Sequence, residues 1–354
     1  MSRKESSAPK KNTKKKPKER SGFARFLRGL GKLLLALLII LVLLAAALYV
    51  TPFFEKTDAT QVAGSADWMA DIPDDRLLSA MVIPGSHDTA TQYAQLSFIT
   101  RCQALSVGDQ LAAGTRYLDV RLGADNGRLK LMHGFTNCKE GPYPWSPVLY
   151  LDAVLRQCTD FLDAHPTECI LFAVKHEHGD EDAQEIARLL DAAFAPYSAY
   201  LLNTEQIPAL GSARGKIVLF RRYGTAALAP NNGFTAEHPG IPLIWDDQAG
   251  TAFITPTYAE KMNGGYALRV QDRYKYDVET KWAAFSEGLG GGDLCLDFLS
   301  TTGKLAYGHP YYFAKKLNRR LESADLTKAA GGAVIIVDFI SAKTASKIYT
   351  ENFR

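Results

Sequence analysis

The sequence predicts an α/β protein that forms one irregular α/β barrel, preceded by a single N-terminal transmembrane helix. Three observations lead to this prediction. Short β-type runs recur over residues 76–354, helical patterns separate several of them, and an uncharged apolar run spans residues 33–50. Hydrophobic residues make up 47% of the 354-residue chain, so it can bury a large core and disorder cannot dominate.

Eight β-type runs are short, and several of them are almost continuously apolar. Such runs are typical of strands that are buried on both faces of a parallel sheet. About eight strands with helices between them predict a single barrel. The predicted strands are 80–84, 115–121, 129–133, 169–175, 216–220, 267–271, 293–297 and 333–338.

Three segments between these strands place apolar residues at helical spacing. The first helix is predicted over 148–162, because Ser146 and Pro147 supply a cap and a first-turn proline before it. The other two helices are predicted over 183–194 and 310–321.

Charge is distributed unevenly along the chain. Residues 1–32 carry 12 Lys/Arg and two acidic residues, and the rest of the 41 basic and 38 acidic side chains, 29 and 36, follow them. A nucleic-acid enzyme carries its positive charge on the folded domain. We therefore expect no nucleic-acid partner, and we interpret the basic tail as a topology signal.

The apolar run at 33–50 has the 18 uncharged residues needed to cross a bilayer. The positive charges before it predict a single-pass membrane protein with a cytoplasmic N-terminus and an extracellular remainder. This gives a disordered tail over 1–32, an anchor over 33–50, a flexible linker over 51–75 and a barrel over 76–354. A cleaved signal peptide is the alternative, since Ala45-Ala46-Ala47 resembles a cleavage site, but signal cores are usually only ~7–15 residues long.

The five cysteines show no C-x-x-C spacing, which gives no support to a zinc or redox motif. An exported domain could join some of them as disulfides, although the odd count leaves at least one thiol unpaired. We expect no cofactor, no bound metal and a monomer.

Polar residues at the carboxyl ends of barrel strands face a common site. Two histidines, an arginine and several carboxylates in one pocket suit phosphoryl transfer. One imidazole removes a proton, the other protonates the leaving oxygen, and the guanidinium neutralises charge on the phosphate. The strand-end residues are His87, Asp88, Asp119, Arg121, His133, Lys175, Glu177, Arg221, Arg222, Asp272, Asp297 and Asp338.

The chain resembles the bacterial phosphatidylinositol-specific phospholipases C, in segments that follow the order of that family. These segments are IPGSHDT (83–89), GTRYLDVRL (114–122), LMHG (131–134), HPTECILFAVKHE (165–177), RGKIVLFRR (214–222), VQDRY (270–274) and VDFIS (337–341). The resemblance covers residues 76–345 and leaves out the basic tail and the anchor. It implies a distorted, incompletely closed TIM-type (βα) barrel with a phospholipase C activity.

The resemblance also implies catalytic roles. His87 corresponds to the general base that deprotonates the inositol 2-hydroxyl, and Asp338 to the carboxylate that orients it. His133 corresponds to the general acid, helped by Asp88. Arg121 corresponds to the phosphate-stabilising arginine, with Asp119 on the same strand. The implied products are diacylglycerol and inositol 1,2-cyclic phosphate.

The implied inositol-binding set is Lys175, Arg222, Asp272 and Tyr274. Adjacent strand residues point to opposite faces, so only one of Arg221 and Arg222 should face the pocket, and Arg222 is the preferred one. Calcium-dependent relatives carry an acidic ligand at the position of Arg121, so this arginine predicts a metal-independent enzyme. The expected partner is phosphatidylinositol, or a glycosylated form of it, in a membrane.

Two alternatives stay open at this stage. One is a catalytically silent barrel that binds inositol lipids or glycans at a cell surface. The other is a metal-dependent glycerophosphodiester phosphodiesterase on a similar barrel. That second enzyme should show acidic metal ligands around the first histidine, and Arg121 fits poorly with such a cluster.

Overall fold

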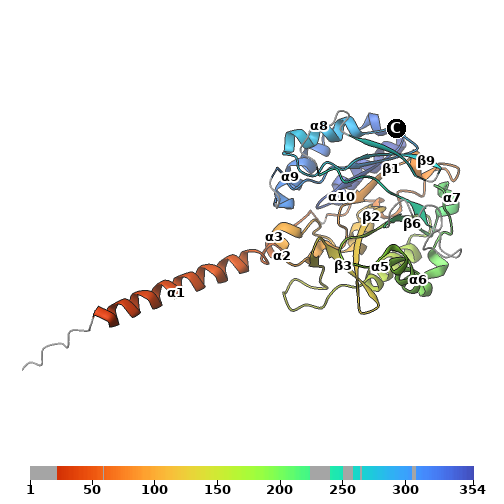
Figure 1. Ribbon diagram of the computed structural model, residues 1–354. Helices are drawn as coiled ribbons and strands as arrows, with labels where there is room; N and C mark the ends of the chain where they lie inside the picture. The colour runs from red at the N-terminus through yellow and green to blue at the C-terminus, as the bar shows by residue number, and fades with distance from the viewer. Residues whose placement is uncertain (1–21, 59, 224–239, 250–257, 264, 305–307) are drawn as a thin grey trace, which may run out of the picture. The chain divides into compact units, whose positions relative to one another are not determined.

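The structure, a computed structural model, describes residues 22–58, 60–223, 240–249, 258–263, 265–304 and 308–354 (Figure 1). The chain forms two compact units, residues 1–46 and residues 47–354. The second unit contains the barrel.

The first unit contains one long helix, α1 (Gly22–Ala47), of 26 residues. Its length and mean hydropathy of 2.8 make it a candidate membrane span, properties that a signal sequence shares. The predicted boundaries 1–32 and 33–50 are wrong, because residues 22–32 are already helical. The helix ends at Ala47 because the next carbonyl, that of Leu48, accepts hydrogen bonds from the Phe98 amide and the Ser97 hydroxyl.

In the second unit an eleven-stranded sheet curves into a nearly closed barrel, with the order β7-β6-β5-β2-β1-β11-β10-β9-β8. All pairs between β7 and β9 in this order are parallel, whereas β8 and the β3–β4 excursion are antiparallel. The parallel strands are β1 (Val82–Ser86), β2 (Tyr117–Asp125), β5 (Ile170–His176), β6 (Ile217–Arg222), β7 (Ile241–Pro242), β9 (Tyr266–Gln271), β10 (Leu294–Phe298) and β11 (Ala333–Val337). The antiparallel strands are β3 (Arg128–His133), β4 (Thr136–Asn137) and β8 (Ala259–Asn263).

The barrel wall is open between β7 and β8, because no backbone pairing joins these two strands in the described part of the chain. The side chain of Asn263 bridges the opening. Its carbonyl oxygen accepts a hydrogen bond from the Ile244 amide at 2.7 Å, and its amide donates to the Ile244 carbonyl at 3.1 Å. The incompletely closed TIM-type barrel is confirmed.

The predicted strands are all present, but 129–133 does not belong to the barrel wall. It forms β3, which returns antiparallel along β2. The strand that replaces it in the wall, β7, has only two residues, too few to show a periodic pattern in the sequence.

Helices cover the outside of the barrel (Figure 1). The predicted helices appear as α5 (Leu151–Ala164), α6 (Ala183–Phe194) and α9 (Pro310–Leu321). The prediction missed α8 and α10, and several short helices. These are α2 (Thr51–Phe54), α3 (Ser97–Thr100), α4 (Val107–Ala112), α7 (Leu210–Ala213), α8 (Val278–Gly288) and α10 (Ala342–Tyr349).

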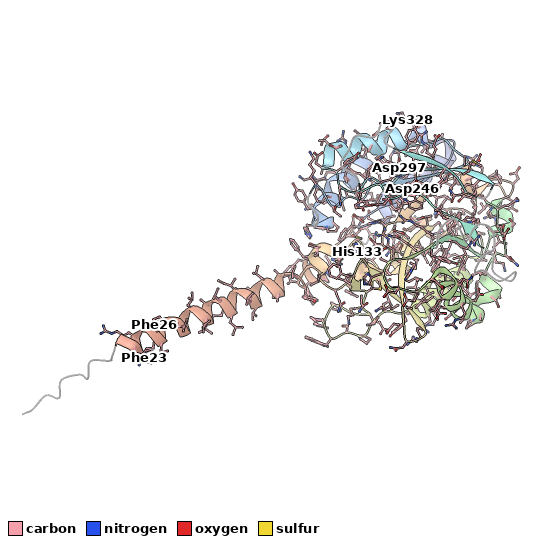
Figure 2. All side chains as sticks on the ribbon, viewed as in Figure 1. Phe23, Phe26, His133, Asp246, Asp297 and Lys328 are labelled. Atoms are coloured by element: carbon pink, nitrogen blue, oxygen red, sulfur yellow. The ribbon has the colours of Figure 1, made fainter. Side chains whose placement is uncertain are left out.

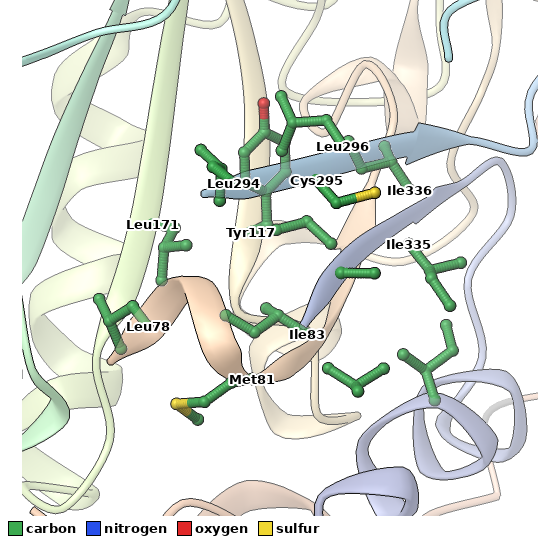
Figure 3. Close-up of a cluster of buried hydrophobic side chains, with 14 of the residues drawn as sticks. Leu78, Met81, Ile83, Tyr117, Leu171, Leu294, Cys295, Leu296, Ile335 and Ile336 are labelled. Carbon is green, nitrogen blue, oxygen red and sulfur yellow. The ribbon is translucent and has the colours of Figure 1, made fainter. Parts of the chain in front are cut away.

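Buried apolar side chains from neighbouring strands pack together in the core (Figure 3). Gly85 shows how tight this packing is, since a Cβ atom there would lie 2.9 Å from Ile336 Cγ1. The five cysteines are all buried and free, so the structure contains none of the disulfides considered for an exported domain.

The flexible linker predicted over 51–75 is wrong, because this segment packs on the barrel. Trp68 and Met69 are buried in the main core. Arg116 and Glu168, both fully buried, form an ion pair at 2.7 Å. Arg116 also donates to the Ala66 carbonyl at 2.7 Å, and Glu168 accepts from the Met69 amide at 3.0 Å. The pair therefore fastens the segment to the barrel.

We expect Glu168→Ala to lower the free energy of unfolding by about 3–5 kcal/mol, because it leaves the buried Arg116 charge without its partner. Urea denaturation of residues 47–354 measures this change. The matched control is Glu185→Ala, which breaks the exposed pair with Arg188 and should lower the free energy of unfolding far less, because water screens that pair. Equal losses in the two variants would contradict the assigned importance of the buried pair.

Candidate active site

A cavity of about 250 Å³ lies where the parallel barrel strands end. The residues of its wall lie in, or shortly after, the strands β1, β2, β5, β6, β9, β10 and β11. The predicted site residues that line it are His87, Arg121, His133, Lys175, Arg222, Asp272, Tyr274 and Asp338. The other two, Asp88 and Asp119, are buried against Arg121. The structure thus brings all ten predicted residues together.

The chain turns sharply directly after β1. The His87 amide donates to the Val337 carbonyl at 3.0 Å, and the Gln103 side-chain amide donates to the His87 carbonyl at 2.8 Å. Asp88 follows with a φ of 45°, in the left-handed region that side chains rarely adopt. This fixed turn directs both His87 and Asp88 towards the pocket.

His87 has a defined proton arrangement. Its Nδ1 lies 2.7 Å from Asp338 Oδ1, and its Nε2 lies 2.8 Å from Arg121 Nη2. The guanidinium can only donate, so a neutral His87 carries its proton on Nδ1 and presents the Nε2 lone pair to the pocket. Burial alone lowers the pKa of His87, but the Asp88 and Asp338 carboxylates outweigh it and the pKa is raised above 6.5.

Arg121 is surrounded by three carboxylates. It lies 3.0 Å from Asp88, 2.9 Å from Asp119 and 3.3 Å from Glu177. Burial alone lowers the pKa of Arg121, but these three acids outweigh it and raise the pKa well above the usual range. The guanidinium in turn holds the pKa of Asp119 and of Glu177 below their usual values, although burial acts in the opposite direction.

His133 reaches the pocket because β3 runs back along β2 (Figure 2). Its Nδ1 donates to the Thr100 carbonyl at 2.6 Å, since a carbonyl oxygen can only accept. Its Nε2 lies 3.5 Å from Asp88 Oδ2, and the same oxygen lies 3.2 Å from His87 Nε2. Asp88 was expected to work with His133, whereas in the structure it lies between the two histidines.

The opposite part of the pocket carries the predicted inositol-binding set. Arg222 lies 3.2 Å from Asp272 and 3.6 Å from Asp119, so it faces the pocket. Arg221 points away and donates to the Gly240 carbonyl at 3.1 Å. Lys175 lies 2.6 Å from Glu177.

Sequence reasoning missed three contributors to this site. The Trp245 ring stacks on the Arg222 guanidinium at 3.6 Å, and its indole N–H donates to Asp272 at 3.1 Å. Asp247 lines the pocket and accepts from the Tyr274 hydroxyl at 3.0 Å. The third is the Thr100 backbone carbonyl, which no side-chain pattern reveals.

Asp297, by contrast, is a strand-end residue that does not face the pocket. It is fully buried and accepts a hydrogen bond from the Gln271 side chain at 2.7 Å. Burial raises the pKa of its carboxyl well above the usual range.

One group in the described part of the chain has the spacing of metal ligands, namely His87, Asp88 and Cys102. Its chemistry fits a metal poorly. Burial, together with Asp338 and Asp88, raises the pKa of the Cys102 thiol well above its usual value, and a protonated thiol is a weak ligand. Asp88 is already paired with Arg121.

Comparisons with known proteins agree with this geometry. Residues 75–223 match the model of the family described as phosphatidylinositol-specific phospholipase C, X domain. The chain is 28% identical to a 1-phosphatidylinositol phosphodiesterase of Listeria monocytogenes, over 80% of this chain and 84% of that relative. A relative of the same name from Staphylococcus aureus is 28% identical, over 77% of this chain and 88% of its own length.

A solved structure shows the same barrel. The phosphatidylinositol-specific phospholipase C from Listeria monocytogenes superposes with a TM-score of 0.58 at 25% identity, covering 81% of this chain and 98% of that chain. The fold and the site together are those of a phosphodiester-cleaving barrel enzyme, in which two histidines and an arginine share one pocket. The family match over residues 75–223 and the shared barrel relate this chain to the phosphatidylinositol-specific phospholipases C.

We expect the His87 imidazole of the folded protein to titrate above 6.5, and Asp338→Asn to lower its pKa, because the substitution removes a negative charge 2.7 Å away. NMR titration of the histidine ring signals measures both values. Asp67→Asn, which removes the carboxylate beside His165, is the matched control and should leave His87 unchanged. A His87 pKa that is the same with and without the Asp338 charge would show that this pair is not formed.

Proposed function

We propose that this protein is a phosphatidylinositol-specific phospholipase C that forms diacylglycerol and inositol 1,2-cyclic phosphate. The observation that carries the proposal is that His87 and His133 share one pocket with Arg121, and that each imidazole holds its Nδ1 proton on a fixed acceptor and turns Nε2 towards Asp88. The family relatives, which bear the name 1-phosphatidylinositol phosphodiesterase, support the same activity.

In the first step His87 acts as the general base. Its Nδ1 proton is held by Asp338, so Nε2 is free to accept the proton of the inositol 2-hydroxyl. The 2-hydroxyl oxygen then attacks phosphorus. The Arg121 N–H groups, which contact His87 without substrate, turn to the non-bridging phosphate oxygens and stabilise their developing charge.

In the second step His133 acts as the general acid. The Thr100 carbonyl holds the Nδ1 proton, and an imidazolium carries its second proton on Nε2. Asp88 Oδ2 lies 3.5 Å from that nitrogen. The Nε2 proton passes to the glycerol oxygen as the bond to phosphorus breaks.

Lys175, Arg222, Asp272 and Tyr274 bind the inositol ring in this proposal. Cations and carboxylates alternate along their side of the pocket, which suits a ring whose hydroxyls both donate and accept. The Tyr274 ring supplies an apolar face. Asp247 orients it through its hydroxyl.

The two alternatives fit the site less well. A metal-dependent phosphodiesterase needs Asp88, Asp119 and Glu177 as ligands, but the Arg121 guanidinium lies among these three carboxylates and neutralises them. A silent binding barrel has no need for two histidines whose Nδ1 protons are both fixed by acceptors.

The membrane supplies the substrate in this proposal. We propose that α1 crosses the bilayer, with the basic tail in the cytoplasm and the barrel outside. Aromatic side chains near the pocket provide a surface for lipid. Phe135, beside the pocket residue Gly134, is 58% exposed, and Tyr312, near the pocket residue Pro310, is 51% exposed.

We expect residues 47–354 to convert phosphatidylinositol into a cyclic inositol phosphate in the presence of chelator, as followed by phosphorus NMR. His87→Ala and His133→Ala should each lower kcat by about 10²–10⁴-fold, because both proton transfers are needed. His165→Ala, remote from the pocket, is the control. Lipid binding without turnover would favour the silent barrel, and activity lost on chelation would favour the metal enzyme.

We also expect Phe135→Ala to weaken binding of residues 47–354 to phosphatidylinositol vesicles by roughly five-fold, since a partly inserted phenyl ring contributes about 1 kcal/mol. Vesicle sedimentation measures this. Phe353 is 50% exposed and next to Asn352, which binds the start of β1 at the opposite end of the barrel. Phe353→Ala should leave binding unchanged, and an equal effect of both substitutions would contradict the assigned surface.

A further inference from the structure

The general acid proposed above depends on a short helix that cannot hold itself in place. The Thr100 carbonyl accepts the Nδ1 proton of His133, and Thr100 is the last residue of α3, a helix of four residues. Leu96 precedes this helix with a φ of 55°, a strained conformation for leucine. One turn of helix is not stable alone, so outside contacts must fix the Thr100 carbonyl.

Those contacts come from the segment that follows α1. The Leu48 carbonyl accepts from the Phe98 amide at 3.2 Å and from the Ser97 hydroxyl at 3.1 Å. The Thr51 hydroxyl donates to the Ser97 hydroxyl at 2.7 Å. The first residue of α3 is thereby tied to residues 48–51.

Glu55 is the charged residue of this segment that is buried, with 7% of its surface exposed. One of its oxygens lies 2.7 Å from His309 Nε2, and the other lies 3.7 Å from Arg101 Nη1. Arg101 directly follows Thr100, and it is itself buried. Glu55 therefore contacts a cation from each of the two segments that enclose α3.

His309 completes the enclosure on the other side. Its Nδ1 donates to the Phe98 carbonyl at 2.6 Å, and its ring stacks on the Phe98 ring at 4.3 Å with an angle of 4°. Both ring nitrogens face acceptors, Phe98 and Glu55, so this geometry needs a protonated imidazole. Burial lowers the pKa of His309, but these two acceptors outweigh it and raise the pKa.

We propose that Glu55 is a positioning residue for the general acid. It holds Arg101 and His309 on either side of α3, and α3 then presents the Thr100 carbonyl that fixes the tautomer and orientation of His133. The inference rests on the proposed function. In this inference the segment after α1 supports catalysis by positioning the general acid, in addition to linking the helix to the barrel.

The test uses two substrates with different leaving groups and the full-length protein in detergent micelles. Phosphatidylinositol has an alkoxide leaving group that must be protonated. Inositol 1-(4-nitrophenyl phosphate) releases nitrophenolate, which departs without a proton. A defect in the general acid therefore slows only the first substrate, whereas a general structural defect slows both.

We expect Glu55→Gln to lower kcat for phosphatidylinositol by about 10–100-fold, with KM changed less than about three-fold. Turnover of the nitrophenyl ester should stay within about three-fold of the unmodified protein, as in His133→Ala. Adding Glu55→Gln to His133→Ala should cause no further loss. The matched control is Glu351→Gln. Glu351 is also a buried glutamate and is paired with Lys347, and its substitution should leave both rates unchanged.

Equal loss on both substrates, no loss on either, or additive losses in the double variant would overturn the inference. If Glu55→Gln does not fold, Thr51→Val decides, because it removes only the hydroxyl contact to Ser97 and should show a smaller loss with the same substrate selectivity. A parent protein that turns over neither substrate would count against the proposed function itself. The two failures are thus distinguishable.

Discussion

The site depends on one constraint, which is that a buried guanidinium must be neutralised from several directions. Arg121 meets one carboxylate within its own strand, β2, and two others that follow β1 and β5. Removing this cation from water costs several kcal/mol unless such partners are present. The three acids in turn would repel one another without it. The charge cluster therefore fixes the relative positions of the strands before any substrate arrives.

The two histidines differ because their Nδ1 protons meet different acceptors. Asp338 is a full negative charge, which increases the basicity of His87, whereas the Thr100 carbonyl is a dipole that fixes only the tautomer of His133. Asp88 lies between the two rings, within 3.5 Å of both Nε2 atoms.

Much of this site could be predicted from the sequence, because the strands are continuous apolar runs and the polar residues stand where those runs end. Alternation predicted that only one of Arg221 and Arg222 faces the pocket, and the structure shows that it is Arg222. Other parts carry no such signal. The Thr100 contact uses a backbone atom, β7 has two residues, and the segment 51–75 buries isolated residues such as Trp68 within a polar sequence. Only tertiary contacts reveal these parts.

The opening in the barrel wall helps to build the pocket. Pro242 ends β7 and has no N–H to donate, so regular pairing with β8 cannot continue past it. The Asn263 amide satisfies both backbone groups of Ile244 in place of a neighbouring strand. The chain is then free to leave the wall at Trp245, whose ring covers Arg222 and whose N–H fixes Asp272. From this free loop, Trp245 contacts Arg222 and Asp272, and Asp247 holds the Tyr274 hydroxyl, so one short segment outside the wall fixes three pocket residues.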